Sequence, residues 1–514
     1  MSIIERIEKK NKRRKMYSKV LWMTLYLIVL FSVSGCNGIN QILGLIRYSQ
    51  EYEFIAYDDG VELFKYNGSS SSVTIPATYG NKKVLRIGDD SFSGNKNITN
   101  IIIADGIKEI GARAFSYCEN LSLISFGSTI ERIEQYAFTC CDSLTEIILP
   151  KSLSHLDEGV FSDSGVKQLD LENGNEAFSI NDGVLFSQNG DTLLFYPPGK
   201  SEKTYNIPRG VTHIGKSAFA SSLLTTLDIP EGVTSIDSAA FENSSLENFN
   251  FPTTLTYIGD YTFSNTPWLK QKKEDYVLVN EKFLVYYQGK EKELNVPEGV
   301  TAVSISNRDV NREDVHILHI SAQVSSLSIG ILTAYDYSYF KVDDENPYFS
   351  TVSTALFNAD KSILLRYPSG ASQTTYTVPE MTSTISNFAF YRCQVNEIIL
   401  SKNLNKINDH AFQSCSTLKK ICIPTETIVI GNFAFAECRQ LEEVLLSEGL
   451  ECIGTQAFDG CDNLNQIRIP KAVEHIGRRA FGVNSKIVII GEKNTYIQNY
   501  AEENGLRFKS ESNT

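Results

Sequence analysis

One stretch of the chain, residues 418–481, contains the same motif three times at a spacing of 23 residues. Each copy begins with Leu-x-x-(Ile/Val)-x-(Ile/Leu), continues to an Ile-Gly pair and ends at an Ala-Phe pair, as at Leu418, Gly431 and Phe435. A period of this length is typical of solenoids, in which successive turns of the chain stack on one another. We therefore expect each copy to be one coil that cannot fold alone, because only its neighbours bury its apolar side chains.

Periodic phenylalanines extend this repeat over most of the 514 residues. They are spaced 22 or 23 residues apart in three groups: Phe92, Phe115, Phe138 and Phe161; Phe219, Phe241 and Phe263; and Phe390, Phe412, Phe435, Phe458 and Phe481. The regularity predicts one elongated body over residues 51–485, although a chain of this length would ordinarily suggest several domains. The leucine-rich segment of each copy alternates like a short half-buried strand, which predicts a mainly β fold with coils of about 23 residues.

The gaps between these groups have a pattern of their own. Residues 175–208 recur, displaced by 171, as residues 346–379, with Leu-Phe, Leu-Leu and Tyr-Pro pairs at matching places. We expect inserted β-hairpins near residues 172–206 and 343–377, and a shorter variant near 268–296. The repeat is weakest over residues 297–339, where Arg308 and Leu332 replace the expected phenylalanine, which predicts distorted coils or a bend.

Both ends of the array carry cap-like sequences. Residues 52–57 and 61–66 flank an Asp58-Asp59-Gly60 turn and predict a hairpin that covers the first coil. Residues 486–514 are expected to form the carboxyl-terminal cap. There Thr495 and Gln498 fit a capping box, Gly505 fits a helix stop, and residues 496–504 predict a short helix. Residues 509–514 are expected to be frayed.

The amino terminus differs from the rest in charge and hydropathy. Residues 1–35 hold eight of the 48 Lys and Arg residues but only two of the 61 acidic ones, so the remainder carries a net charge of −19 compared with −13 for the whole chain. An apolar run over residues 20–33 is too short to cross a bilayer and predicts a signal sequence. The acidic remainder argues against a nucleic-acid partner, since that affinity depends on Lys and Arg.

The repeated motif resembles the BspA-like leucine-rich repeats of bacterial surface proteins. The similarity includes the Ile-Gly and Ala-Phe pairs, the insert that begins at Trp268-Leu269, the Leu-x-x-Tyr-Pro-x-Gly segments ending at Gly199 and Gly370, and the terminal helix. It covers nearly everything after residue 50. The resemblance implies a right-handed leucine-rich-repeat solenoid with strands on its inner, concave face, a cell-surface location, and a role in adhesion or in recognition of proteins or glycans.

Residues 33–36, Val-Ser-Gly-Cys, resemble the lipobox of bacterial lipoproteins. This resemblance implies cleavage before Cys36, a diacylglyceryl anchor on its thiol, and a protein held at the cell membrane and facing outside, with residues 36–50 as a tether. The alternative is an uncleaved signal anchor in which Cys36 is an ordinary residue.

The motifs that would indicate chemistry are missing from the sequence. Six of the nine cysteines after Cys36 lie three residues after a periodic phenylalanine, so we expect a buried ladder of mostly free thiols rather than a metal site or disulfides. There is no Cys-x-x-Cys pair, nucleophile elbow, phosphate-binding glycine loop or zinc-helix motif. We therefore predict a protein that is not an enzyme and that uses neither cofactor nor metal.

Specificity is then expected in the residues that point outward from the strands. The middle variable position of each motif and its flanking position give the predicted ligand face: Ile102, Ile148, Asp228, Asn250, Glu397, Ile399, Lys420, Glu443, Leu445 and Arg468. Exposed aliphatic side chains in such a row mark a binding site, or reflect only the preference of β-branched residues for strands. We predict macromolecular binding by this face, with a glycan- or peptide-degrading envelope enzyme and an architectural surface spacer as alternatives.

Overall fold

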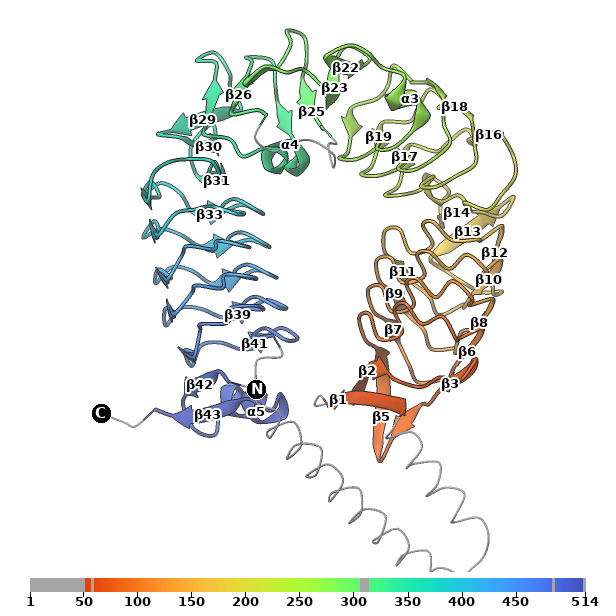
Figure 1. The fold of residues 1–514 in the computed structure, drawn as a ribbon, viewed down its shortest axis with the longest axis horizontal. Helices are drawn as coiled ribbons and strands as arrows, with labels where there is room; N and C mark the ends of the chain where they lie inside the picture. Colours follow the sequence, from red (N-terminus) through yellow and green to blue (C-terminus); the bar gives the residue numbers. More distant parts are fainter. Residues whose placement is uncertain (1–50, 57–59, 306–313, 483–485, 512–514) are drawn as a thin grey trace, which may run out of the picture.

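The computed structural model describes residues 51–56, 60–305, 314–482 and 486–511. The chain winds into a continuous stack of coils that curves into an arch with two arms (Figure 1). The amino-terminal arm and the carboxyl-terminal arm lie side by side, and the middle of the chain forms the crown that joins them. The predicted signal sequence, the tether, Cys36, the Asp58-Asp59 turn and Arg308 lie outside the described residues.

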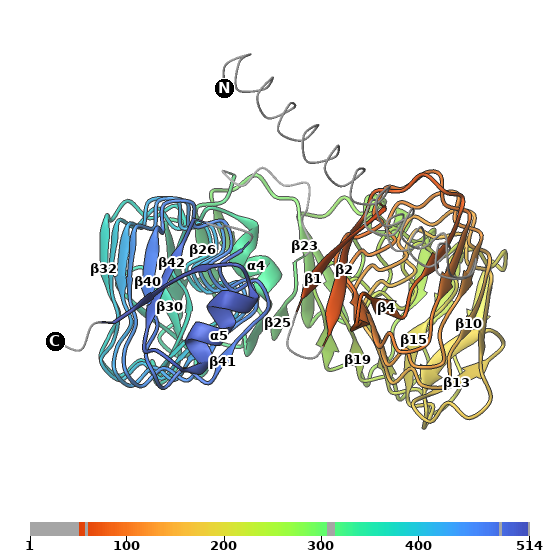
Figure 2. The same ribbon diagram turned by 90° about the horizontal axis from the view of Figure 1, so that it is seen from below.

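Each regular coil contributes a short strand on the inside of the arch (Figures 1 and 2). These inner strands pair in parallel from coil to coil, and each of the four inner ladders starts with antiparallel strands. The first inner ladder consists of β1 (Tyr52–Ala56), β2 (Val61–Tyr66), β5 (Lys82–Ile87), β7 (Glu109–Ile110), β9 (Arg132–Ile133) and β11 (His155–Leu156), with β4 (Thr78–Tyr79) beside β5, and the second of β13 (Phe178–Asn181), β14 (Val184–Ser187), β15 (Thr192–Phe195), β17 (His213–Ile214), β19 (Ser235–Ile236) and β21 (Tyr257–Ile258). The third consists of β22 (Tyr276–Val279), β23 (Phe283–Tyr287), β25 (Ala302–Val303) and β27 (Ser326–Leu327). The fourth consists of β29 (Phe349–Val352), β30 (Ala355–Asn358), β31 (Ile363–Arg366), β33 (Thr384–Ile385), β35 (Lys406–Ile407), β37 (Val429–Ile430), β39 (Cys452–Ile453) and β41 (His475–Ile476). The antiparallel starts confirm the amino-terminal hairpin cap and the three inserted hairpins.

The leucine-rich segments form a second set of parallel strands on the outside of the arch (Figures 1 and 2). The outer strands, grouped by ladder, are β3 (Ser72–Ile75), β6 (Asn100–Ile103) and β8 (Leu123–Ser125); β10 (Glu146–Leu149) and β12 (Gln168–Leu171); β16 (Thr204–Asn206), β18 (Thr226–Asp228) and β20 (Asn248–Asn250); β24 (Glu293–Asn295), β26 (Ile317–Ile320) and β28 (Tyr339–Val342); β32 (Thr375–Thr377) and β34 (Glu397–Ile399); β36 (Lys420–Cys422) and β38 (Glu443–Leu445); and β40 (Gln466–Arg468), β42 (Val488–Gly491) and β43 (Arg507–Ser510).

The expectation that the leucine-rich strands line the concave face is therefore wrong. The physical reason lies in the ladders: hydrogen-bonded strands keep a spacing of about 4.8 Å, so long unbroken ladders hold the inner edges of the coils together. The inner ladders hold up to eight strands, whereas no outer ladder among the described residues holds more than three. Coils that are tied closely on one side and spread on the other curve toward the tied side, which here carries the Ile-Gly strands.

The core between the two sets of strands is a stack of the periodic phenylalanines. In the carboxyl-terminal arm the Phe412, Phe435, Phe458 and Phe481 rings lie nearly parallel, with successive centroids 4.9, 5.3 and 5.7 Å apart. Phe435 is completely buried. Because each ring fills the space between two coils, the stack links the burial of every coil to that of its neighbours.

The glycine of the Ile-Gly pair is required for close packing between coils. A Cβ on Gly454 would lie 2.5 Å from the backbone nitrogen of Asn432, closer than side-chain carbons approach other atoms. The left-handed turn itself lies two residues later, at Gln456 in this coil and at Phe433 and Arg479 in its neighbours, all with φ between 50° and 54°. Side chains with positive φ are uncommon, and here the surrounding coils hold them in place.

Within the described residues, short helices mark the irregular parts of the solenoid. Helix α3 (Pro267–Lys270) opens the second insert, and its amino terminus is capped by the Thr266 hydroxyl, which accepts from the Leu269 nitrogen at 3.2 Å. Helix α4 (Ile329–Ala334) replaces a regular turn in the crown, where Leu332 is buried. The Gly330 nitrogen of α4 donates to the Asp260 carboxylate at 2.9 Å, which ties the region of the predicted bend, residues 297–339, to the coils before it.

The carboxyl-terminal helix cap is confirmed, but its details differ from the prediction. Helix α5 (Tyr496–Glu503) ends before Gly505, which has a φ of +65°. The capping box is wrong: the Thr495 hydroxyl donates to the Glu492 carbonyl at 2.7 Å, and the Gln498 side chain accepts from the Asn494 nitrogen. Residues 509 and 510, expected to be frayed, belong to β43, which pairs with β42 and extends the outer sheet by one strand.

Candidate functional site

The predicted ligand face follows the outer strands of the solenoid. Burial alternates along these strands, so the residues on either side of each buried central residue point to solvent, as in β34, β36, β38 and β40. Parallel pairing without a register shift keeps equivalent positions next to one another, as with Cys422 and Leu445. All ten predicted residues are exposed. They share one side of the coils, on the outside of the arch, but they fall into three separate places.

The carboxyl-terminal arm holds the largest share of the predicted face. Ile399 is 52% exposed and Leu445 is 44% exposed, and the exposed Cys422 lies between them in the row. We call these three residues the carboxyl-terminal apolar group. Glu397, Lys420 and Glu443 occupy the flanking row, where the Lys420 ammonium lies 2.7 Å from the Glu443 carboxylate. At the end of the row, Arg468 pairs with Glu448 at 2.6 Å and also with Glu511.

The amino-terminal arm presents a second group of aliphatic side chains on the same side of the coils. Ile102 is 41% exposed and Ile148 is 60% exposed. Leu123, which the sequence analysis left out, is 57% exposed and pairs in register with Asn100, in the row beside Ile102. Its repeat position is the one that Glu146 and Gln168 occupy in the next coils, so the same alignment of repeats identifies it. We call Ile102, Leu123 and Ile148 the amino-terminal apolar group.

In the crown the row becomes polar. The Asn250 amide donates to the Asp228 carboxylate at 2.5 Å, which places these two predicted residues in direct contact. Further along, Asn295, His319 and Lys341 are in register on β24, β26 and β28. The sequence analysis missed them because the repeat is irregular there.

His319 is the centre of a polar network in the crown. Its Nδ1 lies 2.8 Å from the Asn295 amide oxygen and its Nε2 lies 2.8 Å from the Asp343 carboxylate. Beside it, Lys341 pairs with Glu293 at 2.7 Å. Both ring nitrogens of His319 and the Lys341–Glu293 ion pair are thus engaged in contacts along the strands, which order the surface of the crown.

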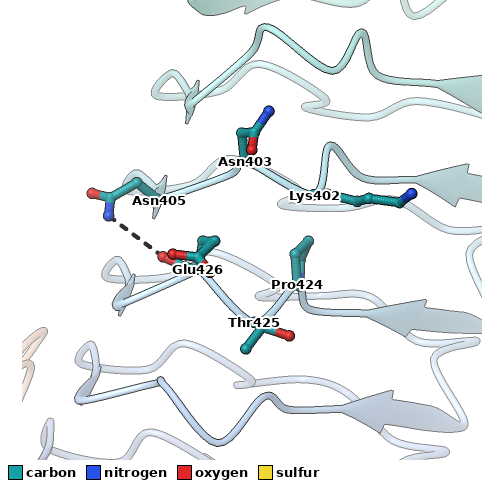
Figure 3. A pocket seen from close by; sticks show the side chains of 6 residues that line it. All are labelled: Lys402, Asn403, Asn405, Pro424, Thr425 and Glu426. Carbon is teal, nitrogen blue, oxygen red and sulfur yellow. Dashed lines mark hydrogen bonds between the residues drawn. The ribbon is translucent and has the colours of Figure 1, made fainter.

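A pocket of about 550 Å³ lies between two coils of the carboxyl-terminal arm (Figure 3). It follows the outer strands β34 and β36, where the chain crosses toward the inside of the arch. Its lining residues are Lys402, Asn403, Asn405, Pro424, Thr425 and Glu426. The Asn405 amide donates to the Glu426 carbonyl at 3.4 Å. All six residues are exposed or half-buried, so the pocket is an open recess with a lining of mixed polar and apolar character.

The cysteine ladder is structural. Six cysteines are buried, and their thiols donate to the carbonyl of the periodic aromatic residue one coil earlier, for example from Cys118 to Phe92 at 3.3 Å. Burial raises the pKa of the Cys118 thiol to about 11 and that of Cys393 to about 12. A thiol with a raised pKa is a weak nucleophile and a poor metal ligand. All nine cysteines after Cys36 are free in the structure.

Within the described ranges, no group of three or more His, Cys, Asp or Glu residues is arranged to hold a metal ion. Among the helices of the same ranges, none has the length and apolar character needed to span a bilayer.

The stacked coils, the parallel ladders and the exposed row define a leucine-rich-repeat solenoid. The family model for the BspA type leucine rich repeat region matches residues 60–188, 195–304 and 368–504, in six copies. The chain therefore belongs to the BspA-type leucine-rich-repeat family. A comparison with curated proteins gives no match.

Solved structures of bacterial leucine-rich-repeat proteins are similar to this chain along most of their length. A leucine-rich repeat protein from Bacteroides ovatus is 19% identical, covering 90% of this chain and 98% of its own, with a TM-score of 0.28. A leucine rich cell surface protein from Faecalibacterium prausnitzii is 20% identical, covering 83% and 93%, with a TM-score of 0.26. The pneumococcal vaccine antigen PcpA is 16% identical, covering 90% and 99%, with a TM-score of 0.29.

Proposed function

We propose that this protein is a non-catalytic cell-surface protein that adheres to a macromolecule through the outer face of its solenoid. The observation that carries the proposal is the carboxyl-terminal apolar group, where two aliphatic side chains about half exposed lie in one row beside paired charges. An apolar centre with a polar rim is the usual composition of a protein interface. The concave face has no part in this proposal, because the predicted residues lie on the opposite side of the coils.

The rigidity of the outer sheet supports a binding role. In the carboxyl-terminal arm each exposed residue of the row follows or precedes a buried one on the same strand, Ile398 or Val444 for example, so its backbone position is fixed by the core. A preorganised surface of this kind loses little conformational entropy when it binds. A protein ligand is favoured over a glycan because the exposed centre is aliphatic, and aliphatic side chains gain most when they meet other apolar side chains.

The first experiment measures binding of residues 37–514 to panels of host and microbial surface proteins and of glycans. We expect saturable binding to a protein, reduced at least about tenfold by the double substitution Ile399→Ser and Leu445→Ser, in line with the loss of a central apolar contact. Met381→Ser is the matched control, because Met381 is 57% exposed in the same arm but lies outside the row.

A charge exchange tests the rim of the same surface. In the double variant Lys420→Glu and Glu443→Lys, the ion pair and the net charge are kept while the pattern seen by a ligand is inverted. We expect weaker binding with an unchanged melting temperature. Binding whose affinity is unchanged in both the apolar double variant and the charge-exchange variant contradicts the proposed surface. Turnover of a glycan or peptide points to the enzyme alternative, and binding to nothing points to the spacer.

The location of the protein is the second part of the proposal. We propose that residues 1–35 are a signal peptide, that Cys36 carries a diacylglyceryl anchor and that the solenoid is displayed outside the cell on the 36–50 tether. The small residues directly before Cys36 support this arrangement. Metabolic labelling with a fatty acid is expected to mark the wild-type protein and to be lost in Cys36→Ala. Labelling that persists in the variant contradicts the anchor.

A further inference from the structure

The two ends of the solenoid touch each other although more than 400 residues separate them. The Arg479 guanidinium of the last regular coil donates to the Glu62 carboxylate on β2 at 2.8 Å, and Arg478 approaches the same carboxylate at 3.5 Å. Figures 1 and 2 show the strands of the first coils beside the end of the other arm. These side-chain contacts bridge the two arms at the open end of the arch.

The amino-terminal side of this contact is an acidic socket. We define it as Glu62, Asp89, Glu109 and Glu134, four carboxylates gathered around the single guanidinium of Arg86, which lies within 3.5 Å of each. The Glu62 side chain is only 2% exposed. A buried carboxylate is costly unless it is paired, and one arginine shared among four carboxylates leaves an excess of negative charge.

The carboxyl-terminal side contributes two further positive charges, those of Arg478 and Arg479. Arg478 also reaches the Glu134 carboxylate at 3.6 Å, so the pair of arginines contacts two members of the acidic socket. The Arg479 guanidinium lies 4.8 Å from the centre of the Phe64 ring, within range of a cation–π interaction. Arg478 and Arg479 remain 38% and 20% exposed, so the contact forms at the rim of the socket rather than inside a sealed core.

The position of Arg479 in the repeat explains how it reaches across. It occupies the left-handed site two residues after the Ile-Gly glycine. At this site in earlier coils, side chains contact the next coil: the rings of Phe388, His410 and Phe433 stack with centroids 4.5 and 4.9 Å apart. In the last regular coil, the side chain at this site contacts the first coils of the chain instead.

From these contacts we infer that the acidic socket and the Arg478–Arg479 pair form an electrostatic clasp that closes the solenoid into a ring and opens when its charges are screened or reversed. The occupant of the socket is the chain's own arginine pair. The charges of the two sides are complementary, and the closed ring turns the outer strands, which carry the proposed ligand face, to the outside. The inference does not depend on the proposed function.

The test measures the distance between the arms in the full chain, purified in mild detergent. Spin labels are attached through an unnatural amino acid at the exposed Lys65 and Lys493 positions, so that native thiols stay unmodified. We expect one short distance at low ionic strength. The short distance should be lost in about 1 M salt, where charges are screened beyond about 3 Å, and also in the double variant Arg478→Glu and Arg479→Glu.

The control variant carries the same change of charge in the same arm, at Arg392→Glu and Arg439→Glu, and should keep the short distance. Equal melting temperatures of the variants separate opening of the ring from unfolding. A short distance that survives the Arg478 and Arg479 reversals overturns the inference. A short distance that appears between singly labelled chains and fades on dilution also overturns it, because the contact then joins two copies.

Discussion

The thiol of Cys438 donates a hydrogen bond to the carbonyl oxygen of Phe412, 3.0 Å away and one coil earlier. The same bond recurs from Cys415 to Phe390 and from Cys461 to Phe435. The cysteine thus fills the gap beside the phenylalanine stack and adds a second donor to a carbonyl that already accepts from the backbone nitrogen of Cys415 in its own turn, at 3.2 Å. This double task explains why a small, weakly polar side chain recurs at one repeat position.

Replacing Cys438 with alanine should therefore be costly. The variant loses a buried hydrogen bond and leaves a small cavity, which together correspond to about 1–2 kcal/mol. Cys422→Ala, in the exposed row of the same arm, should change stability by less than about 0.5 kcal/mol. Thermal unfolding of the two variants checks the difference, and equal melting temperatures would show that the ladder adds nothing to stability.

The cysteines should also differ in reactivity. Because the thiolate is the reactive form, the Cys118 thiol, with its pKa raised by burial to about 11, is ionised at pH 8 to roughly one part in a thousand. We expect an aromatic disulfide reagent to modify Cys422 quickly in the folded protein and the six ladder cysteines only after denaturation. Mass spectrometry of peptides identifies the modified thiols. Rapid modification of Cys118 in the folded state would contradict the ladder.

Replacing the glycine of an Ile-Gly pair with alanine should destabilise the protein more where the neighbouring coil lies closer to that glycine. A Cβ on Gly454 would lie 2.5 Å from backbone atoms of the preceding coil, whereas a Cβ on Gly215 has its nearest contact at 3.1 Å. Gly454→Ala is expected to cost about 1–3 kcal/mol through forced separation of the coils, and Gly215→Ala less. Denaturant unfolding ranks the two, and a larger loss for Gly215→Ala would refute the explanation.

The contribution of Asp260 to the stability of the fold should change with pH in a defined direction. Burial raises its pKa above the ordinary value of 3.8, although hydrogen bonds from Ser328 and Gly330 act in the opposite direction. The folded state then binds more protons than the unfolded state, so this group's contribution to stability is full below pH 3.8 and declines as the pH rises through the folded-state pKa.

The matched substitution is Asp260→Asn, which removes the charge and keeps an oxygen to accept from the Gly330 nitrogen. We expect the variant to lose this decline, so that its melting temperature rises relative to the wild type between pH 4 and pH 7. Asp260→Ala, which leaves the Gly330 nitrogen without its acceptor, should be destabilised at every pH. If the difference between wild type and Asp260→Asn does not change with pH, the assignment to Asp260 is wrong.

Much of the fold could be predicted from the sequence because the same local sequence pattern recurs in many coils. The spacing from Phe435 to Phe458 fixes the length of a coil, and the alternation in Glu443–Leu445 fixes which side chains leave the core. The displaced copy of residues 175–208 identifies an inserted hairpin by its own recurrence. These features depend on contacts within a coil or between adjacent coils, which are near in sequence.

What the sequence alone determined is therefore the coil, its core and its outward residues. The tertiary structure decided which side of the coils becomes the outside of the arch, because curvature is the sum of small differences in ladder spacing over many coils. It also decided that Glu62 meets Arg479. No periodic relation connects residues 417 positions apart, and their contact exists only because the accumulated curvature brings the two ends of the solenoid together.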